Sequence, residues 1–274
     1  MRTRKNRPLV SEVSTGQVRV ERGDIGSIAD AHRLALVAQF STEAAQRRSL
    51  SEYLGALEHA GFLPVVISTA EVDGPLQFPH GVPEGAIVVR RPNLGYDFGS
   101  WATGLGVLPG ARAADVVLLT NDSMMGPFAP IDDLLEWACV PGPDIRGLTG
   151  SHQIASHTQS YFLAFRGGIL ADDPWVRFFN SIRVEPTKMD VVRRYELGLS
   201  RHADEHAYSI DEWVSDFELG VPYANPTMVA WKQLIEHGMP MVKRTVMTDP
   251  STASERDLVR EYVREEFGVE IEEW

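Results

Sequence analysis

A single acidic residue lies among small polar residues where an apolar run ends. Residues 115–119 are Asp-Val-Val-Leu-Leu, and Thr120, Asn121, Asp122 and Ser123 follow directly. A hard cation such as Mg²⁺ takes few oxygens from protein and several from water and phosphate, so one carboxylate facing a diphosphate can hold it. Such an ion stabilises charge on a departing nucleoside diphosphate. The pattern predicts that Asp122 binds a divalent cation or a sugar hydroxyl; the alternative is an ordinary strand-ending turn.

Glycines, an aromatic ring and a carboxylate occur together in residues 91–101, Arg-Pro-Asn-Leu-Gly-Tyr-Asp-Phe-Gly-Ser-Trp. Gly95 permits the backbone to approach a ligand closely. Tyr96 can stack on a ring, and Asp97 can accept a hydrogen bond from a sugar hydroxyl. We therefore expect Asn93, Gly95, Tyr96 and Asp97 to contact a bound ligand. The alternative is a glycine-rich loop in which Asp97 is an ordinary helix N-cap.

A histidine and a glutamine alternate within residues 157–165, His-Thr-Gln-Ser-Tyr-Phe-Leu-Ala-Phe. In an extended strand every second side chain lies on the same face. His157, Gln159 and Tyr161 are therefore expected on one face, where they could contact the sugar of an acceptor. A half-buried histidine with satisfied hydrogen bonds fits the same spacing.

The elements around these three segments indicate a sheet with helices on both faces. Short apolar runs predict strands at residues 34–40, 63–68, 86–90 and 115–119. Their alternation with helices implies βαβ units, a mostly parallel central sheet and the α/β fold class. Ligands of such sheets bind at the carboxyl ends of the strands. The polar strand ends, at residues 41–42, 68–69, 91–93 and 120–123, should therefore face one crevice.

The second half has a different character, and helices outnumber strands in it. A strand is expected at residues 161–165, and helices are expected at residues 174–182 and near 229–237. Capping boxes predict further helix starts at Thr187-x-x-Asp190, Ser209-x-x-Glu212 and Thr252-x-x-Glu255. We therefore divide the chain into a tail or lead-in (1–30), a main domain (31–250) and a C-terminal helix (251–274). The main domain has a nucleotide-sugar-binding half (31–130) and an acceptor-side half (131–250).

Composition narrows the class of protein. The 274 residues are 43% hydrophobic and carry a net charge of −12, which argues against a nucleic-acid partner. The one cysteine, Cys139, excludes an intrachain disulfide framework and fits a reducing cytosol. No apolar run reaches the roughly 18–20 residues that span a bilayer. Residues 1–7 are basic but no apolar segment follows them, so we expect no signal peptide and a cytoplasmic location.

Five separated motifs occur in an order that is similar to a known family. They lie at residues 93–101, 119–127, 147–149, 157–162 and 195–199. Together they resemble the rhamnan-synthesis F family, bacterial glycosyltransferases of cell-surface polysaccharide assembly. The resemblance runs from about Leu34 to Lys243. It implies a GT-A-like nucleotide-diphospho-sugar transferase fold and inverting transfer of rhamnose or a related deoxysugar to a glycan or lipid-linked glycan acceptor.

The resemblance also implies roles for individual residues. Asp122 stands where metal-dependent GT-A enzymes carry Asp-x-Asp, although the first carboxylate of that motif is missing here. A divalent cation, Mn²⁺ or Mg²⁺, is therefore the cofactor considered, with no organic cofactor. The donor-binding residues are expected to be Phe40, Ser41, Asn93, Gly95, Tyr96, Asp97, Asn121, Asp122, Ser123 and Lys243.

The general base is expected to be a carboxylate near the acceptor hydroxyl. Glu196 is the first choice because it lies in the family-like motif at residues 195–199, and Asp97 is the reserve. The alternative for Glu196 is a helix-surface carboxylate paired with Arg193 or Arg194. The arginine pairs 47–48 and 193–194 could also touch lipid phosphates, which would place the protein at the inner face of the membrane.

Two other functions remain open at this point. One is a nucleotide-sugar hydrolase or nucleotidyltransferase on the same sheet, and the other is a non-catalytic glycan-binding protein. His202 and His206 stand four residues apart and could share a zinc ion on a helix. Glu205 precedes the second histidine instead of following the first, as it would in a zinc protease, so we assign no metal site there.

Overall fold

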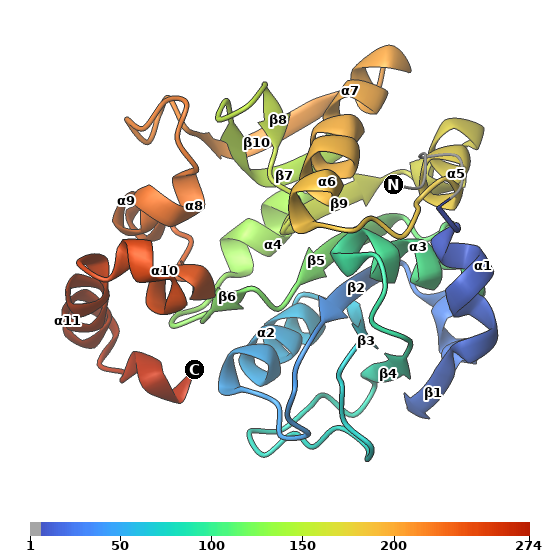
Figure 1. Cartoon of the computed structure of the whole chain (residues 1–274), viewed down its shortest axis with the longest axis horizontal. Helices are drawn as coiled ribbons and strands as arrows, with labels where there is room; N and C mark the ends of the chain where they lie inside the picture. Colours follow the sequence, from blue (N-terminus) through green and yellow to red (C-terminus); the bar gives the residue numbers. More distant parts are fainter. Residues whose placement is uncertain (1–6) are drawn as a thin grey trace.

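A mixed β-sheet runs through the centre of the molecule, with helices on both of its faces (Figure 1). The computed structural model describes residues 7–274, and within that range nine strands form the sheet. They are β1 (Arg19–Arg22), β2 (Arg33–Gln39), β3 (Leu63–Ser68), β4 (Ile87–Arg90), β5 (Val116–Asn121), β7 (Ile145–Ser151), β8 (His157–Thr158), β9 (Phe162–Arg166) and β10 (Ile210–Ser215). Their order is β1-β4-β3-β2-β5-β9-β7-β10, and β8 pairs with β7.

The helices of the described range are short to medium in length. They are α1 (Val10–Ser14), α2 (Arg48–His59), α3 (Tyr96–Val107), α4 (Asp132–Cys139), α5 (Asp173–Asn180), α6 (Lys188–Val191), α7 (Leu197–Glu205), α8 (Pro226–Val229), α9 (Trp231–Glu236), α10 (Arg244–Thr248) and α11 (Glu255–Phe267). A π-helical segment, Val192–Glu196, joins α6 to α7. None of these helices is long and apolar enough to cross a membrane.

The directions of the strands divide the sheet into two parts. β4, β3, β2 and β5 are parallel neighbours, as the first half of the sequence predicts. β9 runs antiparallel to β5 and β7, whereas β10 runs parallel to β7. The prediction of a mostly parallel sheet is therefore wrong for the second half. The chain passes from β7 to β9 through the short strand β8 without a helix, and antiparallel neighbours need no helical crossover.

The parallel part of the sheet is buried on both faces. Along β2, Leu34 and Leu36 belong to a core that α3 covers, and Val37 belongs to the core on the opposite face, which α2 covers. This alternation follows from the two-residue period of a strand. The strand predicted at residues 63–68 occurs at the same residues. The apolar stripe of α2, which includes Leu50, Leu54 and Leu57, is buried against the sheet.

A third, smaller core lies under the C-terminal helices. Two short strands, β6 (Met124–Met125) and β11 (Val242–Lys243), pair antiparallel and connect this region to the end of β5. The core includes Phe128 and Trp274, whose rings meet edge to face with centroids 5.1 Å apart. β11 and α10 thereby acquire fixed positions beside the carboxyl end of β5.

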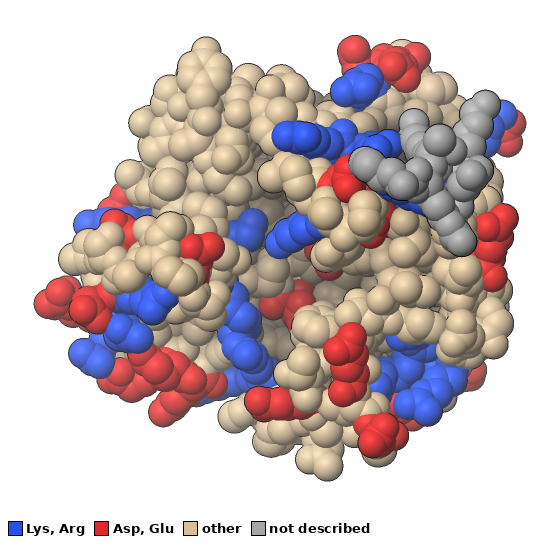
Figure 2. All heavy atoms as spheres, in the orientation of Figure 1, with Lys and Arg blue, Asp and Glu red and all other residues tan. Residues whose placement is uncertain are grey.

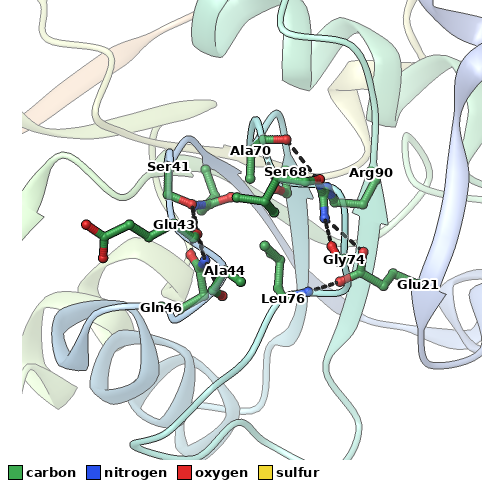
Figure 3. A network of polar contacts seen from close by, with 12 residues as sticks. Glu21, Ser41, Glu43, Ala44, Gln46, Ser68, Ala70, Gly74, Leu76 and Arg90 are labelled. Carbon is green, nitrogen blue, oxygen red and sulfur yellow. Dashed lines mark hydrogen bonds and ion pairs between the residues drawn. The ribbon is translucent and has the colours of Figure 1, made fainter.

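The N-terminal segment differs from the expected tail. Residues 1–6 lie outside the described residues, but from residue 9 onward the chain is regular, because α1 packs against α3 and β1 forms the edge of the sheet. Glu21 of β1 accepts hydrogen bonds from the Leu76 N–H at 2.6 Å and from the Arg90 guanidinium at 3.0 Å (Figure 3). Residues 9–22 therefore belong to the main fold.

One predicted helix start lies in a strand. Ser209 and Glu212 match a capping box, yet β10 passes through this segment. The Ser209 hydroxyl donates to the Asp144 carboxylate at 2.8 Å, and Glu212 accepts from the Thr158 hydroxyl at 2.6 Å. Both side chains therefore form hydrogen bonds with residues in or beside other strands, and the prediction of a helix here is wrong.

Two other helix boundaries also shift. α11 begins at Glu255 instead of directly after Thr252, because the Thr252 hydroxyl donates to the Val246 carbonyl at 2.9 Å. The single helix expected near residues 229–237 is two helices, α8 and α9, separated at Ala230. The start predicted at Thr187 is confirmed, since its hydroxyl accepts from the Asp190 N–H at 3.1 Å.

Candidate active site

A groove opens where the strand order of the sheet reverses. The chain builds β3 and β4 on one side of β2 and then places β5 on the other side, and ligands of open α/β sheets bind at such a switch point. The groove has a volume of about 330 Å³, and its lining includes Gln39, Phe40, Ser41, Asp122, Ser123 and Arg244. Figure 2 shows this face of the molecule hollowed near its centre, with basic side chains beside the hollow and acidic ones inside it. The strand ends at residues 41–42 and 120–123 thus meet in one groove, as predicted, whereas residues 68–69 and 91–93 do not line it.

Asp122 lies at the base of this groove. Its Oδ2 accepts a hydrogen bond from the Phe40 N–H at 3.2 Å, which joins the carboxyl ends of β2 and β5. Burial and, second to it, the neighbouring Asp97 carboxylate raise the pKa of Asp122 to about 7, against the opposing effects of the Phe40 N–H and Arg244. The nearby positive charge is therefore too weak to keep the pKa of Asp122 at its ordinary value.

Asn121 connects Asp122 to its carboxylate neighbour. The Asn121 side-chain amide donates to Asp97 Oδ2 at 2.9 Å, and its Oδ1 accepts from the Ser123 N–H at 3.1 Å and hydroxyl at 2.6 Å. The strand-ending turn that the sequence offered as an alternative is therefore present. The turn does not exclude a binding role for Asp122, because it also places the carboxylates of Asp97 and Asp122 near each other.

Asp97 lies in the first turn of α3 and is not its N-cap. The N-cap is Gly95, with φ 80°, and no side chain caps this helix. Burial raises the pKa of Asp97, while Lys188, the Asn121 hydrogen bond and Lys243 act in the opposite direction. The simple N-cap alternative is thus excluded. The Asp97 carboxylate lies against Asn121 and is not among the residues that line the groove.

The turn before α3 is tightly constrained. A Cβ at Gly99 would lie 2.4 Å from the Leu94 carbonyl oxygen, and Arg91 is buried with hydrogen bonds to Ser100 at 3.0 Å and to the Leu94 carbonyl. Tyr96 has a φ of 55°, unusual for a residue with a side chain, and its ring is exposed. Backbone strain of this kind clusters at ligand sites.

Asn93, predicted to bind the donor, points elsewhere. Its side-chain amide donates to Glu71 Oε1 at 2.9 Å in an exposed loop. It therefore holds the loop after β4 against the loop after β3.

The loop after β2 is fixed by one buried glutamine. The Gln46 amide donates to the Ser41 hydroxyl at 3.2 Å and to the carbonyls of Glu43 and Ala44, and its Oε1 accepts from Gln39 at 2.7 Å (Figure 3). Gln39 is itself buried, and its Oε1 has no protein partner. The wall of the groove at Phe40 and Ser41 is therefore ordered before any ligand binds.

Arg244 lines the groove together with Asp122, whereas Lys243 acts on Asp97 and Glu196. The backbone N–H of Arg244 donates to the Ser123 carbonyl at 2.9 Å, so the ladder between β6 and β11 fixes its position. Burial lowers the pKa of Arg244 to about 10 and also lowers the pKa of Lys243, whose ammonium donates to the Thr227 hydroxyl at 3.2 Å. With a pKa of about 10, Arg244 stays cationic at neutral pH and is a partner for an anion in the groove. The sequence predicts Lys243 as a donor-binding residue but not Arg244, because Arg244 reaches the groove only through the pairing of β11 with β6.

Glu196 lies in a separate cluster on the second half of the sheet. Its carboxylate accepts from the Ser160 N–H at 3.1 Å and from the Ser160 hydroxyl, and it lies 3.6 Å from His157 Nε2. Burial works to raise the pKa of Glu196, but the hydrogen bonds from His157 and Ser160 outweigh it and hold the pKa below its ordinary value. Glu196 is therefore not a surface carboxylate paired with Arg193 or Arg194.

His157 is oriented toward this carboxylate. Its Nδ1 lies 2.8 Å from the Ala155 carbonyl, which leaves Nε2 facing Glu196. Burial works to lower the pKa of His157, yet the bond to Glu196 raises it above its ordinary value. The structure thus brings together two predicted residues, the histidine of β8 and the glutamate of the π-helical segment.

The other predicted acceptor residues lie deeper. The Gln159 amide donates to Asn225 Oδ1 at 3.0 Å, and Tyr161 is buried with its hydroxyl against Thr149 and the Met239 sulfur. Tyr161 also lines a small, mostly apolar cavity below Asp122. Only His157 of these three has a polar atom turned to the Glu196 carboxylate.

A third group of polar residues lies at the exposed end of α7. One ligand atom from each of His202, Glu205 and His206 lies within 4.8 Å of the others, and among the residues that the structure describes no other group of three such side chains is found. The His202 ring also packs on Trp175 of α5, at a centroid distance of 5.0 Å. This group is not part of the groove.

The fold and the groove define an α/β protein in which a carboxylate and an arginine, Asp122 and Arg244, line a switch-point crevice, a site suited to an anionic ligand. The model of the family described as rhamnan synthesis protein F matches residues 85–272. The chain belongs to this family, as its five motifs indicated.

Known proteins similar to this chain cover only part of it. The virulence protein VirA of Vibrio anguillarum is 29% identical over 199 residues, which are 61% of this chain and 64% of VirA. The uncharacterized protein y4gN of Sinorhizobium fredii is 26% identical over 121 residues, 42% of this chain and 32% of that protein. The chain thus spans less than two thirds of the length of either relative. Among solved structures, the glycosyltransferase GlyE of Streptococcus pneumoniae TIGR4 is similar with a TM-score of 0.41 and 11% identity, over 89% of this chain and 63% of that one.

Proposed function

We propose that the protein is a glycosyltransferase that moves a sugar from a nucleoside-diphosphate donor to a glycan acceptor. The observation that carries this proposal is that Asp122, whose pKa is raised, and Arg244 line one groove at the switch point of the sheet. Membership of the rhamnan synthesis protein F family supports the same role. We propose a GT-A-like fold on the parallel order of β4, β3, β2 and β5.

The nucleoside diphosphate would occupy the groove between β2 and α10. Phe40 and Ser41 would contact the nucleoside, because they form the ordered wall at the end of β2. Arg244 would pair with the diphosphate, with Lys243 nearby, and cations so placed stabilise the charge that develops on a leaving group. The exposed Tyr96 ring, at the start of α3, would lie against the sugar.

The donor set of the site fits a divalent cation. Asp122 offers carboxylate oxygens in a groove where burial disfavours their unpaired charge, and Mg²⁺ or Mn²⁺ completes its shell with phosphate and water oxygens. Bound there, the ion would supply Lewis-acid stabilisation of the departing diphosphate. We propose that Asp122 is its main protein ligand.

Two carboxylates compete for the role of general base. Glu196 was the first choice from sequence, but its hydrogen bonds to Ser160 and His157 favour the ionised form and make it a weak proton acceptor. The pKa of Asp97 is raised, which brings a carboxylate closer to the value that suits a base at neutral pH. We therefore propose Asp97 as the base of an inverting transfer, with Glu196, His157 and Gln159 positioning the acceptor.

The finer identity of both substrates is also a proposal. We propose rhamnose or a related deoxysugar as the donor sugar, from the name of the family, and a cell-surface glycan or its lipid-linked form as the acceptor. A peripheral contact with the inner face of the membrane would bring the site to a lipid-linked acceptor.

The first test combines a binding assay with a transfer assay. Nucleotide sugars, with and without Mn²⁺, are screened for a rise in melting temperature, and a ligand at 100-fold its Kd should add about 2.7 kcal/mol to the free energy of unfolding. Asp122→Ala should abolish transfer and leave the protein folded. Asp115→Ala, which removes an exposed carboxylate just before the other end of β5, should keep wild-type transfer.

Each rival function has its own result. Free sugar formed with water as the acceptor would identify a hydrolase, and release of pyrophosphate would identify a nucleotidyltransferase. If no nucleotide sugar raises the melting temperature, even with Mn²⁺, the result favours a non-catalytic glycan-binding protein. Full transfer by Asp122→Ala would remove the basis of the proposal.

A further inference from the structure

Three rings gather on the surface beyond Glu196. We name His152, Phe217 and Tyr223 the ring platform. The ring of Phe217 lies 4.8 Å from that of His152 and 5.8 Å from that of Tyr223, centroid to centroid, with interplanar angles of 74° and 76°. Phe217 is 53% exposed and Tyr223 is 68% exposed. A single exposed apolar side chain is common, but exposed rings that contact one another form a patch, and such patches mark binding sites.

A buried aspartate holds the platform in place. The side chain of Asp216 has no exposed surface, and its carboxylate accepts from the His152 N–H at 2.8 Å, from His152 Nδ1 at 2.8 Å and from the Tyr223 N–H at 3.2 Å. Burial works to raise the pKa of Asp216, but these bonds outweigh it and hold the pKa below its ordinary value, so the carboxylate stays charged. One ionised group thus fixes the chain on both sides of the platform.

The backbone of the platform is strained. Tyr223 has a φ of 66°, a conformation that costs free energy in any residue with a Cβ. Its ring gains no burial in return, because it is the most exposed of the large apolar side chains among the residues that the structure describes. Strain without a packing benefit indicates that the exposed ring serves a ligand.

The platform leads back to the candidate active site. Residues 223–227 run from Tyr223 to Asn225, which accepts from Gln159 at 3.0 Å, and to Thr227, which accepts from the Lys243 ammonium at 3.2 Å. A long acceptor bound at Glu196 could therefore extend along this segment. This continuity links the platform to the acceptor side of the groove, away from the Phe40 wall.

The charge of the surrounding surface indicates which class of ligand could bind to the platform. Figure 2 shows a broad region without Lys, Arg, Asp or Glu, where Figure 1 places the connection from β10 to α8, which carries Phe217 and Tyr223. The nearest exposed charge in sequence is acidic, that of Glu218. A phosphate or an anionic lipid headgroup would find no cation there. The C–H faces of neutral sugar rings suit exposed aromatic rings that also offer a polar edge.

We propose that the ring platform is an acceptor subsite, which stacks on an uncharged sugar residue of a glycan chain whose end lies at the reaction centre. This inference rests on the proposed glycosyltransferase function and adds the class of its acceptor, a neutral glycan of more than one sugar residue. Asp216 is the positioning residue of this subsite.

The experiment measures glycan binding, without transfer, on the full chain. A rhamnan oligosaccharide and a dextran oligosaccharide of equal length are titrated against wild type and against the double variant Phe217→Ala, Tyr223→Ala. We expect the double variant to bind the rhamnan oligosaccharide about tenfold more weakly, because each ring contact contributes roughly 0.5–1.5 kcal/mol and 1.4 kcal/mol is tenfold. Leu258→Ala is the matched control, since Leu258 is 54% exposed on α11, outside the platform, and it should bind as wild type does.

The outcomes separate this subsite from the function on which it rests. The melting shift with nucleoside diphosphate and Mn²⁺ should be the same in wild type and the double variant, because no platform residue lines the groove. Equal glycan affinity in the two proteins, or binding of neither oligosaccharide by wild type, would overturn the subsite even where the donor shift persists. Platform-dependent binding to phosphatidylglycerol vesicles in place of glycan would overturn it as well. Absence of the donor shift in wild type counts against the glycosyltransferase itself.

Discussion

The two carboxylate clusters of the site are opposites in their electrostatics. On the first half of the sheet, Asp97 and Asp122 repel each other, and burial raises the pKa of both. On the second half, Glu196 receives hydrogen bonds from Ser160 and His157, which hold its pKa low. In the first cluster burial outweighs the nearby cations, whereas in the second cluster the hydrogen bonds outweigh burial.

This difference indicates a division of labour. Groups whose environments move their pKa values apart are suited to opposite tasks in acid–base chemistry. The aspartates of the groove can take up a proton or a cation, so we assign them to chemistry and to the diphosphate. Glu196 remains charged and fixed, which suits the positioning of an acceptor hydroxyl.

Replacing single carboxylates by amides should give the largest effects and tests the difference between the two clusters most directly. Asp97→Asn should lower kcat by about 10³, because general-base catalysis contributes roughly 10²–10⁴. Glu196→Gln should lower kcat by only about tenfold and raise KM for the acceptor, because it loses a positioning contact. The measurement is steady-state transfer at saturating donor. A larger loss of kcat in Glu196→Gln would move the base to Glu196.

The stability of the groove cluster should depend on pH with a defined sign. The folded pKa of Asp122, about 7, exceeds its ordinary value of 3.8, so the folded state binds more protons between these values and stability falls as pH rises. Without cation, Asp122→Asn should therefore be more stable than wild type at pH 8 by about 1–2 kcal/mol, after allowance for partial exposure. Denaturant unfolding at pH 5 and pH 8 checks this. An advantage that is larger at pH 5 would contradict the raised pKa.

The Glu196 cluster should show the smallest effect, with a different pH window. The raised pKa of His157 contributes stability that is lost as pH rises through its folded pKa, above 6.5, and the lowered pKa of Glu196 contributes stability that is lost as pH falls through its folded pKa, below 4.5. His157→Gln should therefore cost about 1 kcal/mol near pH 5.5 and less at pH 8. The exposed pair of His32 and Asp115 gives a control variant, His32→Gln, which should cost almost nothing at either pH. A pH-independent cost in His157→Gln would indicate lost packing instead of lost charge.

The sequence predicted well those features that depend on residues close together in the chain. Apolar runs located β2, β3 and β5, and the polar residues that end β2 and β5 followed from their positions in those runs. The turn at Asn121 and the place of Asp97 in α3 are likewise consequences of neighbours in the chain. Residues of this kind can be assigned to a site from the order of amino acids alone.

What the sequence did not predict depends on contacts between distant segments. Arg244 reaches the groove only because β11 pairs with β6, across more than a hundred residues of chain. Ser209 and Glu212 form a valid capping pattern, and only the ladder between β10 and β7 decides that they lie in a strand. Asp216 has no local signature either, since its partners lie at residues 152 and 223.

The separate core under the C-terminal helices has a consequence for ligand exchange. Arg244 and Lys243 belong to the elements that pack on this core, whereas Asp122 belongs to the main sheet. Small satellite cores open more readily than central ones, and a ligand that contacts both parts stabilises the closed arrangement. Amide hydrogens of β11, α10 and α11 should therefore exchange with deuterium faster than those of β2 and β5, and slow markedly when a nucleoside diphosphate is bound.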